Sequence, residues 1–223
     1  MRRARAARPH RDAGLTLIET MVGVVIFTLI GGLLTTLVVD MLRSSAGTSS
    51  RLTGVNSVRV ALDAMTKSLR TAVRPEQINA ACASNCDSAF RTAGSNSVTF
   101  YANYGEAGKA QLTTYRVEAD PDHAGTARLV EETFAAAAPG GSPSTTCGVG
   151  CTKRVLARGL TWPLGPTDPV FDFADEQCAD FDAVVPLTRI SCVLIDVPIA
   201  GSKLDKGTSA TATVFLPNSV MGR

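Results

Sequence analysis

The longest apolar run of the chain lies near its N-terminus. From Leu15 to Val39 there are 25 residues without a proline, and Glu19 is the only charged residue among them. At about 1.5 Å of rise per residue, a helix over this run is roughly 37 Å long, which is enough to cross a bilayer. The pattern therefore predicts a transmembrane helix from Leu15 to Val39. It also places a carboxylate at membrane depth, where an ionised acid costs on the order of 2.5 to 3.5 kcal/mol, so Glu19 needs a functional explanation.

A helical pattern of a different kind follows the apolar run. Apolar residues recur there at spacings of three, four, three and four, with charged residues between them: Val55, Val58, Leu62, Met65 and Leu69. A single apolar stripe of this kind predicts an amphipathic helix that docks against a sheet. Pro75 ends the pattern, because proline lacks the backbone N–H that continues a helix. We therefore expect one long helix over residues 15–70.

Beyond Pro75 the pattern changes to short runs of alternating or β-branched residues. We expect a polar loop over residues 76–97 and a surface excursion over residues 135–152. The predicted strands are 98–104, 112–118, 127–134, 154–160, 170–173, 193–199 and 211–216. Short turns separate the first three strands, which predicts an antiparallel meander. The fold class is therefore α+β, with the long N-terminal helix packed on a C-terminal antiparallel β-sheet domain.

The cysteines all lie beyond the apolar run, and their number is even. They are Cys82, Cys86, Cys147, Cys151, Cys178 and Cys192. Small and polar residues surround them, which indicates disulfides formed in an oxidising compartment. Sequence alone leaves all pairings of six cysteines open, and among them we expect nearest neighbours to pair. A metal site is the alternative, but the C-x-x-x-C spacing differs from that of a zinc knuckle.

Net charge is divided unevenly along the chain. The whole sequence holds 22 Lys and Arg against 20 Asp and Glu, and five of the arginines precede Gly14 with a single aspartate. Residues 15–223 therefore carry a small net negative charge. Arginines before an apolar run favour a cytoplasmic N-terminus, which places the cysteines outside. The body of the chain shows no basic patch with interleaved aromatic residues, so nothing indicates a nucleic-acid partner.

The sequence contains no recognisable catalytic motif. It has no G-x-S-x-G, phosphate-binding loop or H-E-x-x-H pattern. The only histidine beyond the N-terminal basic segment, His123, lies in the turn sequence D-P-D-H-A-G. We therefore expect neither an enzyme nor an organic cofactor.

An acidic stretch runs from residue 168 to residue 182, and no Lys or Arg occurs between Arg158 and Arg189. Closely spaced oxygen ligands in an extracellular loop are a candidate Ca²⁺ site. The candidate ligands are Asp172, Asp175, Asp180 and Asp182. Their spacing fits no EF-hand, and we favour a solvated acidic loop or an electrostatic docking surface for a partner subunit.

Three ordinary explanations exist for the N-terminal apolar run. One is a secretory signal cleaved near residues 44–46, but the apolar run of such a signal is normally about half as long as the run seen here and carries no glutamate. A plain signal anchor suits the length but leaves Glu19 unexplained. A buried core helix conflicts with the basic flank and with the length.

A fourth explanation comes from the residues around Gly14. The stretch A-G-L-T-L-I-E, residues 13–19, follows a short basic leader and resembles the processing site of type IV prepilins and pseudopilins. In that family a membrane-bound prepilin peptidase cuts after the glycine and methylates the new N-terminal amine. The resemblance implies cleavage after Gly14, N-methylation of Leu15 and a role for Glu19 as the assembly carboxylate. Leu15 departs from the commonest residue at this position, which is phenylalanine.

A charge pair gives this resemblance a physical basis. Cleavage creates a cationic amine at Leu15, and axial stacking of helices in a filament brings the amine of one subunit against Glu19 of its neighbour. In a low-dielectric bundle the pair is attractive, whereas either group alone is penalised. The implied partners are other pilins or pseudopilins, the prepilin peptidase and the cytoplasmic membrane.

The rest of the chain resembles the minor pseudopilins of the J type. The match lies in the end of the helix, D-A-M-T-K-S-L-R-T-A-V over residues 63–73, in the late V-x-I-x-V-x-I repeat and in a last strand that ends in L-P-N. The resemblance implies a structural subunit, either of a type IV pilus-like filament or of a type II secretion-like filament.

These inferences predict a three-part organisation. Residues 1–14 form a basic leader, residues 15–70 the long helix, and residues 71–223 an extracytoplasmic β-rich domain. The protein is expected to cross the cytoplasmic membrane once, with its N-terminus in the cytoplasm, and to reach the cell surface in a filament. The alternative is a signal-anchored extracytoplasmic binding domain that does not polymerise.

Overall fold

The computed structural model describes residues 17–78, 86–103, 111–134, 147, 150–165, 168–181, 184–200 and 208–217, and of residues 46–53 only the backbone. The chain divides into two compact units, Met1–Thr48 and Ser49–Arg223. Helix α1, Leu17–Leu69, is continuous, and it contributes its apolar part to the first unit and its amphipathic part to the second.

The amphipathic part of α1 buries one face in the second unit. Five of its apolar side chains have almost no exposed surface: Val58, Ala61, Leu62, Met65 and Leu69. They share one side of the helix, because positions three and four apart are neighbours on a helix surface. The charged residues between them, Arg59, Asp63 and Lys67, are exposed. The predicted docking of this stripe is confirmed.

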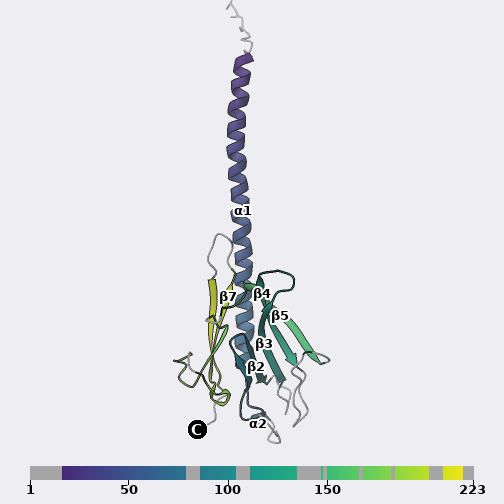
Figure 1. The fold of residues 1–223 in the computed structure, drawn as a ribbon, viewed down its shortest axis with the longest axis vertical. Coiled ribbons are helices and arrows are strands. Elements are labelled where there is room, and N and C mark those ends of the chain that lie inside the picture. Colours follow the sequence, from purple (N-terminus) through teal and green to yellow (C-terminus); the bar gives the residue numbers. More distant parts are fainter. Residues whose placement is uncertain are drawn as a thin grey trace, which may run out of the picture. The chain divides into compact units, whose positions relative to one another are not determined.

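The second unit also contains an antiparallel sheet, which has eight strands among the described residues (Figure 1). The strands are β1 Phe90–Gly94, β2 Ser97–Ala102, β3 Gln111–Ala119, β4 Thr126–Phe134, β5 Cys151–Thr161, β6 Phe171–Ala174, β7 Cys192–Ile199 and β8 Thr208–Phe215. Their order is β1-β2-β3-β4-β5-β7-β6, and β8 pairs with β7. The predicted meander is present as β2, β3 and β4. The α+β fold class is therefore confirmed.

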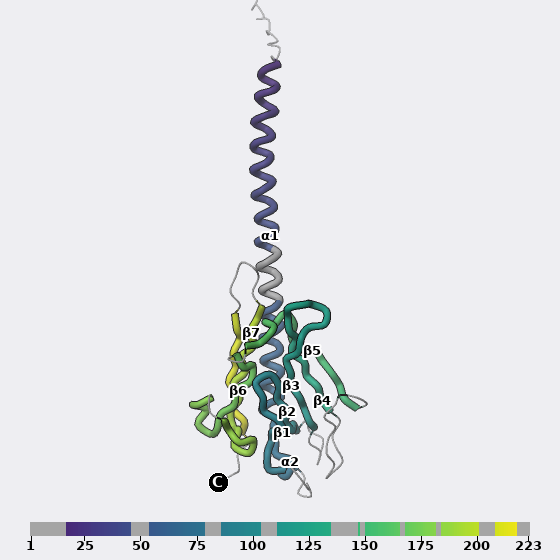
Figure 2. Tube along the Cα trace, in the orientation of Figure 1, coloured from purple at the N-terminus to yellow at the C-terminus, as the bar shows by residue number. Residues whose placement is uncertain are grey.

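The sheet curls around the amphipathic part of α1 (Figure 2). Its end strands approach each other, since the backbone N–H groups of Val170 and Phe171 donate to the carbonyl of Ser95 at 2.8 and 2.9 Å. The rings of Phe90 in β1 and Phe173 in β6 have centroids 6.1 Å apart. Side chains of α1 and of strands from both ends of the sheet form one apolar core. The helix therefore supplies the centre of the domain.

The sequence pattern missed three short elements: a strand, a helix and a 3₁₀ turn. The polar loop predicted for residues 76–97 is wrong in part, because Phe90–Gly94 forms β1 and a short helix α2, Pro75–Ile78, precedes it. Phe90 is the only fully buried residue of β1, so this five-residue strand carries no alternating pattern to detect. A 3₁₀ turn, Leu187–Arg189, precedes β7.

The predicted surface excursion over residues 135–152 is also wrong at its end. Cys151 and Thr152 already belong to β5, where they pair with Phe134 and Thr133 of β4. Residues 135–146 lie outside the described residues. Pairing with β4 thus extends β5 beyond the residues 154–160 from which the strand was predicted.

We expect Met65→Ala to destabilise the second unit. Met65 is fully buried, and truncation of a buried methionine to alanine costs about 2 to 5 kcal/mol. The matched control is Val60→Ala on the same helix, because Val60 is 63 % exposed. Denaturant titration of the full-length protein in detergent reports both, since the single tryptophan, Trp162, packs against the core. Equal denaturation midpoints for Met65→Ala and Val60→Ala would contradict the placement of Met65 in the core.

Candidate functional site

The apolar part of α1 is exposed along its whole described length. Its large apolar side chains expose between 38 % of their surface, at Val39, and 79 %, at Leu17. Among the described residues it is the one helix long and apolar enough to cross a membrane, over Leu17–Ser45. Apolar surface of this extent indicates contact with a membrane or with protein. One N-terminal apolar helix of this kind fits a single-pass membrane anchor.

Threonines within this helix satisfy their own hydrogen-bonding groups. Thr20, Thr28, Thr35 and Thr36 each donate their hydroxyl to a backbone carbonyl three or four residues earlier, at 2.8 or 2.9 Å. A hydroxyl bonded in this way does not need water, so it is tolerated in hydrocarbon. The polar threonines are therefore compatible with a membrane-spanning helix.

Glu19 is the exception. It lies in the first turn of α1, is exposed, and has no hydrogen-bond or ion-pair partner among the described residues. The helix dipole stabilises a carboxylate in the first turn by about 0.3 to 1 kcal/mol. That is less than the cost of about 2.5 to 3.5 kcal/mol for an acid within a bilayer. An ionised Glu19 within a bilayer therefore needs a counter-charge. The two predicted processing residues, Gly14 and Leu15, lie outside the described residues.

Comparison with known families bears on this segment of the chain. Residues 9–35 match the family model described as the prokaryotic N-terminal methylation motif. The chain therefore carries this methylation motif near its N-terminus. The match includes Gly14, Leu15 and Glu19 and supports a type IV prepilin-like protein; the motif is a structural, pilin-type one and defines no enzyme class. No curated protein and no solved structure matches the chain.

Two disulfides are formed among the described residues. They join Cys147 to Cys151 and Cys178 to Cys192, with Cα atoms 5.2 and 5.5 Å apart. Both follow the nearest-neighbour pairing expected from the sequence. Cys86 is also disulfide-bonded, and its expected partner Cys82 lies outside the described residues.

The two bridges stabilise different parts of the sheet. The Cys147–Cys151 bridge lies at the start of β5 and packs on a small apolar cluster of Tyr101, Leu112 and Phe134, which come from β2, β3 and β4. The second bridge ties the segment after β6 to the first residue of β7. A loop closed by a disulfide loses less conformational entropy on folding.

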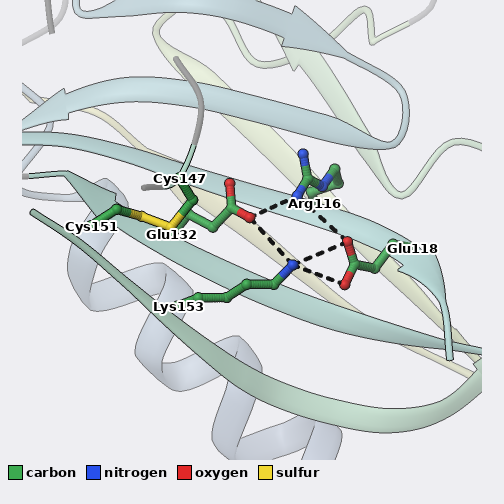
Figure 3. Close-up of a disulfide and its surroundings, with 6 residues drawn as sticks. All are labelled: Arg116, Glu118, Glu132, Cys147, Cys151 and Lys153. Atoms are coloured by element: carbon green, nitrogen blue, oxygen red, sulfur yellow. Dashed lines mark hydrogen bonds and ion pairs between the residues drawn. A yellow bond between two sulfur atoms is a disulfide. The ribbon is translucent and has the colours of Figure 1, made fainter. Parts of the chain in front are cut away.

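An ionic network lies beside the first disulfide (Figure 3). Lys153 Nζ is 3.2 Å from a Glu118 oxygen and 3.4 Å from a Glu132 oxygen, and Arg116 donates to Glu132 at 2.7 Å. The Glu132 side chain is only 5 % exposed, and these partners offset the cost of burying its carboxylate. Burial raises the pKa of Glu118, but hydrogen bonds from Arg128 and Lys153 outweigh it, so the pKa lies below its ordinary value. The network joins β3, β4 and β5.

A second charge cluster closes the turn between β3 and β4. The Asp120 side chain is fully buried and accepts the backbone N–H of Asp122 at 3.1 Å. Arg158 of β5 donates to both Asp120 oxygens, at 2.8 and 3.0 Å, and His123 Nδ1 lies 3.4 Å from Asp120. Burial raises the pKa of Asp120, but these hydrogen bonds lower it below its ordinary value. The D-P-D-H-A-G turn therefore has a structural role.

The acidic segment predicted as a candidate Ca²⁺ site contributes to β6 and the loop after it. Asp172 lies in β6, Asp175 and Asp180 follow it, and Asp182 lies outside the described residues. Asp172 accepts the N–H of Phe173 at 2.9 Å. Within the described ranges no group of three or more His, Cys, Asp or Glu side chains is arranged to hold a metal ion. Calcium binding stays a prediction.

We expect Asp120→Asn to reduce the acid sensitivity of unfolding. The pKa of Asp120 is lower in the folded protein than its ordinary value of 3.8, so between these values the folded state binds fewer protons than the unfolded state. The stabilisation is present above about pH 4 and is lost as the pH falls through the lowered pKa. The variant should therefore be less stable at neutral pH and show a flatter stability curve in acid.

Denaturant titrations followed by Trp162 fluorescence at several pH values measure this effect. Asp63→Asn is the matched control, because the Asp63 side chain is 66 % exposed and its pair with Lys67 lies on the helix surface. Such exposed pairs contribute little to stability. Parallel curves for the wild type and Asp120→Asn would show that the contact with Arg158 does not fix the turn.

Proposed function

We propose that the chain is the precursor of a type IV pilin-like structural subunit that assembles through the apolar part of α1. Prepilin peptidase cuts after Gly14 and methylates Leu15, and the mature helix enters a helical bundle of other subunits. The observation that carries the proposal is the methylation motif over residues 9–35 with Glu19 at the start of an exposed apolar helix. The peptidase carries out both chemical steps, and the role of the mature chain is assembly.

The Leu15 amine of a neighbouring subunit supplies the missing counter-charge of Glu19. Peptide-bond cleavage frees this amine, which stays cationic after methylation because nitrogen keeps its lone pair for a proton. An unpaired charge in a low-dielectric bundle is penalised, whereas the pair is attractive. The remaining surface of the helix is apolar and permits many axial offsets, so the charge pair selects one of them. In this proposal Glu19 specifies register more than it adds stability.

We propose further that the protein is a minor subunit, exported with its β-sheet domain outside the cytoplasmic membrane. The pattern of residues 63–73 and of the last strands supports a minor pseudopilin of the J type or a related minor pilin. The disulfides support an oxidising compartment for the sheet domain. In a filament the domain faces outward, where it caps, initiates or functionalises the fibre.

We expect Glu19→Gln to leave membrane insertion intact and to block assembly. Loss of one partner of a desolvated charge pair should lower the amount of protein in sheared filaments at least about tenfold. Immunoblots of the sheared and membrane fractions measure both quantities. Asp40→Asn, which removes an acid at the other end of the apolar run, is the matched control and should assemble normally. Normal assembly of Glu19→Gln would favour a non-polymerising membrane anchor.

We expect the native protein to begin at an N-methylated Leu15. Intact mass and N-terminal sequencing of protein purified from its own cells measure this directly. A chain that keeps residues 1–14 would overturn processing by prepilin peptidase. A soluble chain that begins at Gly47 would indicate cleavage of a secretory signal after residues 44–46 instead.

A further inference from the structure

The last strand of the sheet has an open edge. β8 pairs with β7 over its whole length, from Thr208 opposite Ile199 to Phe215 opposite Cys192, without a shift of register. Within the described ranges no strand pairs with its other side. The β8 sequence, T-S-A-T-A-T-V-F, has no charge and no proline. Charges, prolines and bulges are the features with which proteins block strand addition at an edge, and β8 has none of them.

The hydrogen bonds of β7 identify the β8 backbone groups that face the open side. The N–H of Asp196 donates to Val170 at 2.9 Å, on the β6 side of β7. Successive residues of an antiparallel strand bond alternately to one side and to the other. Asp196 and Thr211 are paired in register, so the N–H and C=O of Thr211 point away from β7. The same alternation directs the backbone groups of Ser209 and Thr213 to the open side.

β5 shows how the same sheet blocks a free edge. One side of β5 pairs with β4, and on the other side the pairing seen among the described residues is that of Leu160 with Ile199 of β7. Two register shifts interrupt the pairing of β5 with β4, and Lys153, Arg154 and Arg158 are exposed along the strand. Bulges and cations oppose strand addition. β8 has neither bulges nor charged residues, so its edge is not protected against strand addition in this way.

An acidic pocket borders the start of β8, the yellow strand of Figure 2. Its volume is about 420 Å³, and Asp168, Asp172 and Asp196 line it together with Thr208 and Ser209. The Oδ1 atom of Asp196 is buried and accepts no hydrogen bond from any described residue. A buried acceptor without a donor is unfavourable. Because the chain has no Lys or Arg from residue 159 to residue 188, the segment that forms one wall supplies no cation.

The pocket lies within reach of a strand added to β8. Asp196 and Thr211 oppose each other and share one face of the sheet, and a residue opposite Thr211 on an added strand shares that face too. At about 4.8 Å per strand, its backbone lies roughly 10 Å from that of Asp196. A long side chain with a cationic end spans this separation past the small Thr211. A bound metal ion fits less well, since the described residues hold no metal-binding group of three.

We propose that the open edge of β8 docks an extended segment of a partner polypeptide, which places a lysine or arginine side chain in the pocket of Asp168, Asp172 and Asp196. Main-chain hydrogen bonds to residues such as Thr211 hold the segment, as in other cases of strand addition. The carboxylates select a basic segment over a neutral one. The proposal goes beyond assembly through α1, because the edge and the pocket lie wholly in the second unit.

Synthetic peptides test the proposal on the full-length protein in detergent micelles. The probe is a short labelled peptide of alternating threonine and valine with one central lysine, and the matched peptide has norleucine in place of the lysine. Fluorescence anisotropy should show at least about tenfold tighter binding of the lysine peptide. Asp196→Asn should remove this preference while the norleucine peptide still binds.

Proline substitution tests the role of the backbone. Thr211→Pro should abolish binding of both peptides, because it removes an N–H that points to the open side of β8. The variant should still fold, because proline is tolerated where the N–H of an edge strand faces solvent. Thr211→Val keeps the N–H and should bind like the wild type. Trp162 fluorescence shows whether each variant is folded, and Thr213→Pro makes the same test if Thr211→Pro is unfolded.

Several outcomes would overturn the proposal. Equal affinity for the two peptides, or binding that survives Thr211→Pro in a folded protein, contradicts it. Self-association that Thr211→Pro blocks would assign the edge to a second copy of the chain. A lysine preference that appears only after Lys203→Gln and Lys206→Gln would show that the chain fills its own pocket; both lysines lie outside the described residues. Glu19→Gln should bind the peptides normally, which separates this proposal from filament assembly.

Discussion

Helix α1 has two apolar surfaces, and each must be removed from water by a different partner. The arrangement of the rest of the molecule depends on this requirement. Over its amphipathic part a single stripe is apolar, and the chain's own sheet buries it. Over Leu17–Ser45 apolar side chains are exposed all round, and the chain provides no cover among the described residues. Burial of apolar surface contributes roughly 25 cal/mol per Å², so this surface must be satisfied by lipid or by other subunits. Membrane insertion and assembly are therefore alternative solutions to one physical problem.

The sheet must curl to cover a helix, and curling determines which strands end as edges. Contact between Ser95 and the start of β6 closes one side of the sheet around α1. Where β5 has diverged from β7, the ion pairs of Arg116, Glu132 and Lys153 join β3, β4 and β5, and the Cys147–Cys151 bridge lies at the start of β5. Among the described strands, β8 pairs with β7 on one side and with none on the other.

Periodicity made most of this architecture predictable. The stripe from Val58 to Leu69 and the alternation of Val193 to Ile199 are strong patterns, because each buries one face against the same core. β1 was not predicted, because its five residues carry no strand pattern of their own and become a strand by pairing with β2. Glu19 could be singled out from the sequence because it is the single charged residue among the 25 residues from Leu15 to Val39.

Partners that lie far apart in the chain could not be predicted in the same way. Asp120 and Arg158 are separated by 38 residues, and the pairing of β3 with β4 and of β4 with β5 brings them together. Asp196 is the charged residue within the V-x-I-x-V-x-I repeat, but its place at an acidic pocket depends on Asp168 and Asp172, which come from a different segment of the chain. Sequence patterns show which face a residue occupies. They do not show what lies opposite it.

The two proposed contact surfaces use charge for the same physical reason. An apolar helix can pack at many axial offsets, and a strand edge can pair at many registers, because each presents a repeating surface. A slip of one residue along β8 would turn a lysine of the added strand to the opposite face, away from Asp196. A slip along α1 would separate the amine of one subunit from Glu19 of the next. In each case a repeating surface supplies the adhesion and a single carboxylate selects one arrangement among many.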